Sequence, residues 1–220
     1  MRRKFEFNAI ERDSIGVGFT VGLYGFSFGA IAHAAHASTW QAMCLSSVLF
    51  SGGSQFALVG ALAEGSSALS AVAVALFLGI RNALYAVRLQ PITKHYSMVK
   101  RFIAGHITID ESAAMATAQE RQPEARMAFW ATGFGVFVFW NLFTLLGALG
   151  AKAIGNTSAW GLDVASPAIF CAVLYPRLKE RSFLFAALLA FIWALSITEF
   201  VPAGVPIIST VVIAAVLGWK

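Results

Sequence analysis

Charged side chains are what this sequence has least of. Only 12% of its 220 residues are Asp, Glu, Lys or Arg, whereas a soluble domain has about 25%. Residues 14–63 contain none of these four types. As a helix with about 1.5 Å rise per residue, this stretch is roughly 75 Å long and can cross a ~30 Å hydrocarbon layer twice. The composition excludes an ordinary soluble domain and predicts a polytopic membrane protein.

Several chemical signatures are also missing. The two cysteines, Cys44 and Cys171, both lie in apolar segments and are too few for a disulfide framework or a zinc site. The sequence has no Walker loop, dinucleotide fingerprint or zinc-ligand spacing. We therefore expect no enzymatic activity, no metal, no cofactor and no ATP-driven transport by this chain alone. The net charge of +5 does not indicate nucleic-acid binding, because the basic residues lie at segment ends, where topology explains them.

Apolar segments alternate with short polar stretches along the chain. We expect a single domain over residues 1–220, with an all-α fold: a polytopic membrane helix bundle of about six or seven transmembrane segments. Acidic residues follow the basic start, so we expect no cleaved signal peptide. The polar central segment is 92–126, within which 108–119 can form a helix that begins near Asp110 and Glu111. The apolar segments are 14–36, 40–63, 66–90, 127–151, 160–176, 182–200 and 203–219.

The basic residues give two interpretations of the topology. The N-terminus and the central segment are both basic and both favour the cytoplasm, yet three apolar segments separate them. Either the N-terminus is outside and seven segments cross, or one early segment is broken and does not cross fully. The glycine-rich stretch 51–55 makes the second segment the candidate for such a break.

A weak internal repeat predicts two halves, 14–91 and 127–200, that could be inverted relative to each other. A shift of 120 residues aligns the elements 45–55 and 165–175, and chance remains an alternative explanation. Duplicated, often inverted halves are a common plan of transporters, with the binding site at discontinuous helices near the midplane. The identical pairs are Trp40 and Trp160, Ser46 and Ser166, and Phe50 and Phe170.

The densest polar cluster in the apolar region is a candidate substrate site. Serines can simply bond back to helical carbonyls. Adjacent glycines flanked by serines and a glutamine instead suggest an unwound point, where a helix N-terminus could hold a carboxylate. The cluster consists of Ser51, Gly52, Gly53, Ser54 and Gln55.

The first apolar segment carries glycines on one helix face at positions 18, 22, 25 and 29. Small residues let helices approach closely in lipid, so helix packing is one interpretation. The other is that Gly25 and Gly29 bring backbone close to a substrate beside Ser27. The same stretch matches the Gly-x-Ser-x-Gly nucleophile motif, but it lies within a membrane helix rather than at a strand–turn–helix junction, so we do not expect hydrolase chemistry.

Ionisable residues inside apolar segments are costly unless paired, and they often mark function. Arg81, next to Asn82, lies within the third segment, where Glu64, Asp163 or Glu199 could pair with it. Asp163 and Glu199 are also candidates for proton coupling, although Glu199 could equally be an interfacial cap. Arg81, Asn82, Asp163 and Glu199 are therefore our candidates for buried charge or coupling.

Taken together, several short motifs resemble the AzlC-type family, the large subunit of branched-chain amino acid exporters, from about residue 16 to residue 176. The resemblance implies proton-driven efflux of leucine, isoleucine, valine and methionine across a bacterial inner membrane, with a small AzlD-type membrane subunit as partner. The motifs are GFSFG at 25–29, QAMCLSSVLFSGGSQF at 41–56, RNALY at 81–85, DES at 110–112, WNL at 140–142, LLG at 145–147, GLD at 161–163 and PA at 167–168.

The resulting hypothesis is a secondary exporter that binds a zwitterion. The carboxylate would meet backbone N–H groups at 51–55 and 25–27, and the ammonium would meet a carbonyl or an acidic group. The aliphatic side chain would lie among phenylalanines such as Phe26, Phe28, Phe50 and Phe56. The alternatives are a non-transporting scaffold or assembly subunit, a channel, or a transporter of another small solute.

Overall fold

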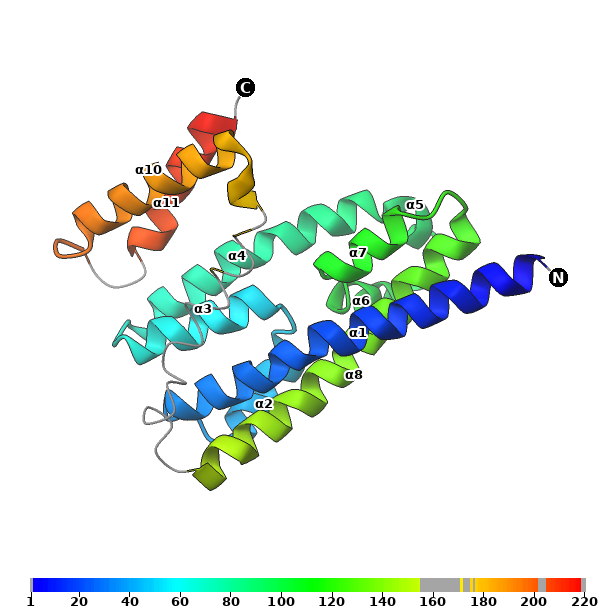
Figure 1. Ribbon diagram of the computed structural model, residues 1–220, viewed down its shortest axis with the longest axis horizontal. Coiled ribbons are helices and arrows are strands. Elements are labelled where there is room, and N and C mark those ends of the chain that lie inside the picture. The colour runs from blue at the N-terminus through cyan, green and yellow to red at the C-terminus, as the bar shows by residue number, and fades with distance from the viewer. Residues whose placement is uncertain (1, 155–170, 172–174, 176, 202–204, 219–220) are drawn as a thin grey trace.

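The fold is built from helices of very unequal length, as a computed structural model shows (Figure 1). The structure describes residues 2–154, 171, 175, 177–201 and 205–218, and within these ranges it contains helices and turns but no strand. Three of the described helices are long and apolar enough to cross a membrane. This confirms the predicted all-α membrane helix bundle.

The three long helices are α1 (Arg2–Ala34), α4 (Ala68–Arg88) and α8 (Gln122–Ile154). Their apolar, span-length stretches are Ala9–Ala34, Ala68–Arg88 and Gln122–Ile154. Both α1 and α8 extend several residues beyond the apolar segments expected from the sequence, because their first turns are polar and continue the helix outside the apolar run. Hydropathy marks the membrane-compatible part of such a helix and not its end.

Helices α1 and α8 run parallel and in close contact. The glycines of α1 meet α8 in the same order along both helices, and a Cβ at Gly22 would lie 2.5 Å from Cβ of Phe139. Thr132 Oγ1 donates to Ser14 Oγ at 3.0 Å near the start of the contact. Close approach of this kind requires glycine, since any side chain would force the backbones apart. The contacts are Gly18 with Gly135, Gly22 with Phe139, Gly25 with Trp140, and Gly29 with Thr144 and Ala148.

The second apolar segment is broken, as predicted, but two residues earlier than expected. Helix α2 (Thr39–Val48) ends, residues 49–51 are non-helical, and α3 (Gly52–Ala63) begins at the glycine pair. At about 1.5 Å per residue neither helix can span a ~30 Å layer. Helix α3 returns toward the end from which α2 came, and α4 then runs antiparallel to α3 (Figure 1). The pair α2–α3 is therefore a re-entrant hairpin.

The polar central segment forms three short helices rather than one. These are α5 (Gln90–Thr93), α6 (Met98–His106) and α7 (Asp110–Thr117), the last of which confirms the helix predicted in 108–119. The His106 ring contacts the Phe50 ring, with centroids 5.8 Å apart, so the end of α6 reaches the tip of the α2–α3 hairpin. Helices α6 and α7 thus form a second inward hairpin, which approaches from the opposite end of the bundle.

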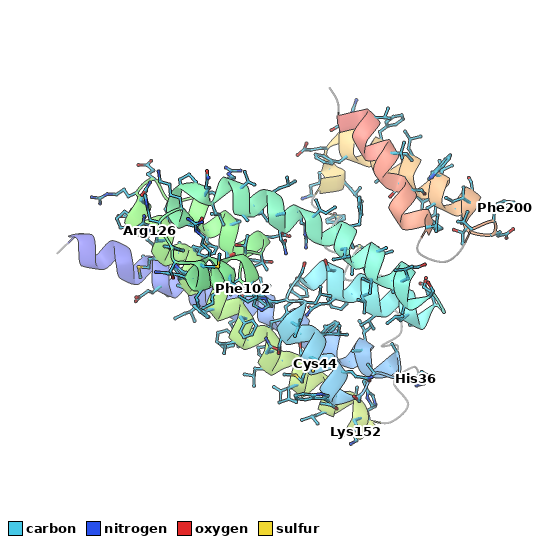
Figure 2. All side chains as sticks on the ribbon, turned by 180° about the vertical axis from the view of Figure 1, so that it is seen from behind. His36, Cys44, Phe102, Arg126, Lys152 and Phe200 are labelled. Atoms are coloured by element: carbon cyan, nitrogen blue, oxygen red, sulfur yellow. The ribbon has the colours of Figure 1, made fainter. Side chains whose placement is uncertain are left out.

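The parallel course of α1 and α8 bears on the two topologies. Arg126 at the start of α8 lies toward the end of the molecule where α1 begins, whereas Lys152 and His36 lie at the other end (Figure 2). Between its N-terminus and the central segment, the chain therefore has two described helices that are long and apolar enough to cross a membrane, α1 and α4. This geometry agrees with the broken-segment interpretation, in which both basic regions lie on one side.

The second half of the predicted repeat lies largely outside the described residues. Residues 155–170, which include Asp163, Trp160 and Ser166, are not described. Helices α1 and α8 begin the two predicted halves and run parallel, whereas inversion would require them to run in opposite directions. The repeat and the single-domain organisation remain predictions.

The C-terminal part of the chain is a separate helical hairpin beside α4 (Figure 1). It consists of the 3-10 turn η3 (Arg177–Lys179), α10 (Arg181–Ile197) and α11 (Val205–Gly218). Trp193 Nε1 donates to Ser209 Oγ at 2.9 Å and joins α10 to α11. Glu199 is exposed in the turn that follows α10.

Candidate functional site

The α2–α3 hairpin and the α6–α7 hairpin meet at a cavity of about 340 Å³ between the long helices. This volume lies near the lower end of the ~300–1,000 Å³ range of small-molecule pockets. The non-helical residues at the tip of each hairpin contribute to the wall, and so do the first residues of α3 and α7. The lining residues are Val21, Tyr24, Phe50, Ser51, Gly52, Gly53, Phe56, Leu78, Arg81, Asn82, Ile109, Asp110, Glu111, Val136 and Trp140.

The first turn of α3 forms one polar side of the cavity. The first N–H groups of a helix have no intrahelical partner and carry the positive end of its dipole, and Ser51 makes no side-chain cap to them. Side chains from α8 and α4 pack closely against the two glycines. A Cβ at Gly52 would lie 3.0 Å from the Trp140 ring, and one at Gly53 would lie 3.3 Å from Nη2 of Arg81.

An ion pair joins α4 to α7 across the cavity. Arg81 Nη1 donates to Asp110 Oδ2 at 2.8 Å, and the two side chains are about 40% exposed. Among the described residues, neither Glu64 nor Glu199, two of the three partners expected for Arg81, makes such a contact, and Asp163 lies outside them. The arginine instead meets an acidic residue from the central segment, which the sequence assigned to a polar connection outside the apolar spans.

Glu111 lies beside this ion pair. Burial raises the pKa of its carboxyl above the ordinary value of 4.5, while a hydrogen bond from its own backbone N–H lowers it. The neighbouring Asp110 raises the pKa further, and Arg81 lowers it. Because burial is the largest of these effects, Glu111 holds its proton to a higher pH than a solvated glutamate does.

Four residues of the wall carry buried polar atoms with no protein partner among the described residues. They supply two donors, Nε of Arg81 and Nε1 of Trp140, and two acceptors, Oδ1 of Asn82 and Oδ1 of Asp110. Leaving such a group unpaired costs about 1–3 kcal/mol, and a functional site is one of the places where proteins retain it. Donors and acceptors together suit a ligand that carries both signs of charge.

Aromatic rings form an apolar part of the cavity wall. Phe56 packs edge-on against Phe28 and Trp140, with ring centroids 5.6 and 6.3 Å apart. Phe50 packs edge-on against Phe137 at 5.0 Å. Because these rings hold one another in place, they present a fixed hydrophobic surface next to the charged residues. Such a surface suits an aliphatic or aromatic side chain.

Some of the residues predicted from sequence line this cavity and others do not. Ser51, Gly52, Gly53, Arg81 and Asn82 line it. Of the four phenylalanines expected to hold the aliphatic side chain, Phe50 and Phe56 line the wall, whereas Phe28 is fully buried behind it and Phe26 is 46% exposed.

Four further candidates lie near the cavity without lining it. Ser54 is buried and its hydroxyl lies 3.1 Å from that of Ser51. Gln55 is also buried and donates from Nε2 to the carbonyl of Leu45 at 2.9 Å, which joins the two halves of the broken segment. Gly25 packs against the backbone of Trp140, and Ser27, two residues further along α1, is absent from the wall. For the glycine face of α1, packing is therefore the interpretation that describes the contacts.

The remaining two candidates fall elsewhere. Glu199 is exposed in the C-terminal hairpin and does not line the cavity. Asp163 lies outside the described residues.

Sequence reasoning did not assign four polar residues to the wall: Tyr24, Asp110, Glu111 and Trp140. The two acids were recognised as the start of a helix and as part of a family motif, but not as site residues. A usable signal was present, because two adjacent carboxylates begin a helix whose next residues, Ser112 and Ala113, are apolar or small enough to be buried. Trp140 carried no signal of its own, since a tryptophan in an apolar span is ordinary.

Long apolar helices, two inward hairpins and a charged cavity where they meet define a polytopic membrane protein with discontinuous helices, an arrangement that many transporters use. The AzlC family, described as AzlC protein, matches residues 16–154, and the chain belongs to this family. A protein of Archaeoglobus fulgidus described as an uncharacterized membrane protein is 28% identical over 159 residues, which are 71% of this chain and 68% of that protein. No solved structure matches. All cavity-lining residues fall within the range that the family covers.

Proposed function

We propose that this chain is a secondary active exporter of the branched-chain amino acids leucine, isoleucine and valine, and of methionine. The observation that carries the proposal is the composition of the cavity wall. A guanidinium, an unpaired indole N–H and a helix N-terminus supply donors, two carboxylates and an amide supply acceptors, and aromatic rings supply an apolar surface. A zwitterion with an aliphatic side chain satisfies all three at once.

The proposed binding mode differs from the one expected from sequence. The substrate carboxylate meets Arg81 and the first turn of α3, and its ammonium meets Asp110 and Glu111. The aliphatic chain lies against Phe50 and Phe56. Since one methylene changes binding by about 1–3 kcal/mol in such a pocket, overlapping substrates are expected.

The proposal includes the setting in which the chain works. The protein would act in the cytoplasmic membrane of a bacterium with a small AzlD-type subunit, and it would catalyse no chemical reaction. Proton motive force would drive export. Membership of the AzlC family and the absence of a nucleotide-binding motif from the sequence support this picture.

The experiment that tests the function is leucine counterflow in proteoliposomes. The chain is reconstituted alone and together with a co-expressed small membrane subunit, and uptake of labelled leucine is followed against preloaded leucine. Saturable exchange with competition by isoleucine and valine supports the proposal and shows whether one chain suffices. Folded protein that exchanges none of these in either preparation contradicts it and favours a scaffold or another solute, whereas non-saturable flux indicates a channel.

A further inference from the structure

Among the described residues, the cavity wall holds one carboxylate more than it has cations. Three charged side chains of this described wall line the cavity: Arg81, Asp110 and Glu111. The ion pair at 2.8 Å balances the first two. Glu111 is left without a cation of its own, so ionising it places an uncompensated negative charge in a largely apolar enclosure. Proteins avoid such charges by neutralising the group or by supplying an opposite charge.

Neighbouring elements offer Glu111 no second cation among the described residues. Helix α7 packs against α4 and α8. From α4 the charged group is Arg81, and from α7 itself it is Asp110, whereas α8 contributes only Val136 and Trp140 to the wall.

Three further groups complete the surroundings of Glu111. The nearby end of α6 carries His106, whose ring contacts Phe50 and Phe137 and is not part of the wall. Helix α1 contributes the phenol of Tyr24, and α3 contributes the positive end of its dipole at Gly52. Neither the phenol nor the helix terminus carries a full positive charge, and His106 lies outside the wall.

The proton affinity of Glu111 follows from this arrangement. Burial and the adjacent carboxylate of Asp110 both raise the pKa of Glu111, against the lowering effects of its backbone hydrogen bond and of Arg81. In the empty cavity the neutral acid is therefore favoured over a wider pH range than in water.

An amino acid substrate changes the charge balance. Its ammonium group supplies the missing cation, and an opposite charge within about 4–6 Å of a carboxyl favours ionisation. We infer that Glu111 holds either a proton or the ammonium group of the substrate, but not both, so that binding an amino acid expels a proton. This inference rests on the proposed function and adds to it the residue that couples the two flows.

The step balances as an exchange. The O–H bond of the Glu111 carboxyl breaks, its proton passes to water on the side to which the cavity is open, and the carboxylate accepts a hydrogen bond from the incoming ammonium. On the other side the reverse step takes up a proton and releases the amino acid. Because one group serves both ligands, inward movement of a proton is tied to outward movement of substrate, which is antiport.

The first test needs no substrate. The carboxyl C=O infrared band of the full-length protein is followed by pH titration in wild type, in Glu111→Gln and in the control Glu120→Gln, which changes an exposed glutamate beyond α7. We expect a protonated-carboxyl band that persists above pH 4.5 in wild type and in the control and is lost in Glu111→Gln. A band that survives in Glu111→Gln overturns the assignment.

The second test adds leucine. In weak buffer with a pH-sensitive dye, wild type and Glu120→Gln should release a proton for each leucine bound, and the infrared band should disappear. Glu111→Gln should bind leucine more weakly, because a neutral amide replaces a carboxylate that meets the ammonium. The exchange that remains should release no proton and gain no acceleration from a pH gradient. Proton release by Glu111→Gln, or a wild-type band that survives saturating leucine, overturns the exchange.

The outcomes separate the two proposals. If Glu111→Gln still transports leucine in response to a pH gradient, the coupling role of Glu111 is wrong, but the proposed export function remains supported. A wild-type protein that has the Glu111 band but neither binds nor exchanges any branched-chain amino acid contradicts the exporter, and with it the exchange at Glu111.

Discussion

Gly53 and Arg81 lie against each other, such that a Cβ on Gly53 would stand 3.3 Å from Nη2 of Arg81. The contact places the first turn of α3 beside the only cation in the described cavity wall. Two sources of positive potential, a helix N-terminus and a guanidinium, therefore converge on one spot. A carboxylate bound there would meet both.

Replacing Gly53 with alanine should weaken substrate binding more than it affects folding. The added methyl must displace the guanidinium by a few tenths of an ångström or intrude into the cavity, which misplaces a donor of the site. We expect a several-fold rise in the half-saturating leucine concentration in counterflow. Gly60→Ala is the matched control in the same helix, since a Cβ there has no neighbour within 4 Å. Equal effects of the two changes would contradict the site.

Loss of the Arg81 charge should strongly weaken leucine binding in saturable exchange. Arg81→Gln removes the cation that pairs with Asp110 and leaves that carboxylate next to Glu111 without compensation. A charge-assisted hydrogen bond is worth roughly 1.5–3 kcal/mol, so we expect at least a ten-fold loss of affinity. Arg88→Gln, at the exposed end of the same helix, is the control. Leucine exchange by Arg81→Gln at the wild-type rate and affinity would rule out this binding mode.

Gln55 should act on stability rather than on substrate recognition. Gln55→Leu removes the donor to the Leu45 carbonyl at the break between α2 and α3, and the loss of this buried bond should cost about 1–3 kcal/mol. Thermal unfolding in detergent checks this against Gln90→Leu, which changes an exposed glutamine. If Gln55→Leu has wild-type stability but no longer binds leucine, Gln55 contacts the substrate and this prediction is wrong.

The glycine contact between α1 and α8 should be intolerant of a single methyl group. A Cβ at Gly29 would overlap the backbone of Thr144 and Ala148, and overpacking of this kind costs about 1–3 kcal/mol. Gly16→Ala is the control, because a Cβ there meets nothing within 4 Å and alanine favours a helix over glycine by about 1 kcal/mol. The melting temperature should fall for Gly29→Ala and stay level or rise for Gly16→Ala.

The raised pKa of Glu111 predicts the sign of a pH dependence. The folded protein keeps this proton at pH values where the unfolded chain has lost it, so the free energy of unfolding should fall as pH rises from 4.5 through the folded pKa. Glu111→Gln should flatten this part of the profile, whereas Glu120→Gln should not. Melting temperatures across the pH range check the slope, and a slope that Glu111→Gln leaves intact must come from other groups.

The local features of the site were predictable, and their partners were not. Adjacent glycines in an apolar segment predicted a helix break. The low helix propensity of glycine and the free-energy cost of polar groups in a membrane can both be evaluated from a few neighbouring residues. Arg81 stood out for the same reason. Its partner Asp110 did not, since the two residues are distant in sequence and no periodic pattern links them.

The central segment shows why the remainder escaped prediction. Hydropathy assigned Asp110 and Glu111 to a polar connection, yet α7 folds back so that these residues line the cavity and Ile109 joins the core around Phe50 and Trp140. A short helix buried by protein need not be apolar, because it never faces lipid. Likewise, the glycine face of α1 predicted close contact with some helix, and only the structure identifies α8.

The closely packed pair of helices α1 and α8 also determines which parts of the molecule can move. Its close contacts join backbone to backbone, with no side chain between them to yield, so neither helix can slide along the other without collision. The cavity's charged residues lie instead on α4 and α7, and its helix terminus lies on α3. We therefore expect α1 and α8 to stay fixed relative to each other while the short helices move against them. Opening the cavity would then require only a movement of a hairpin tip.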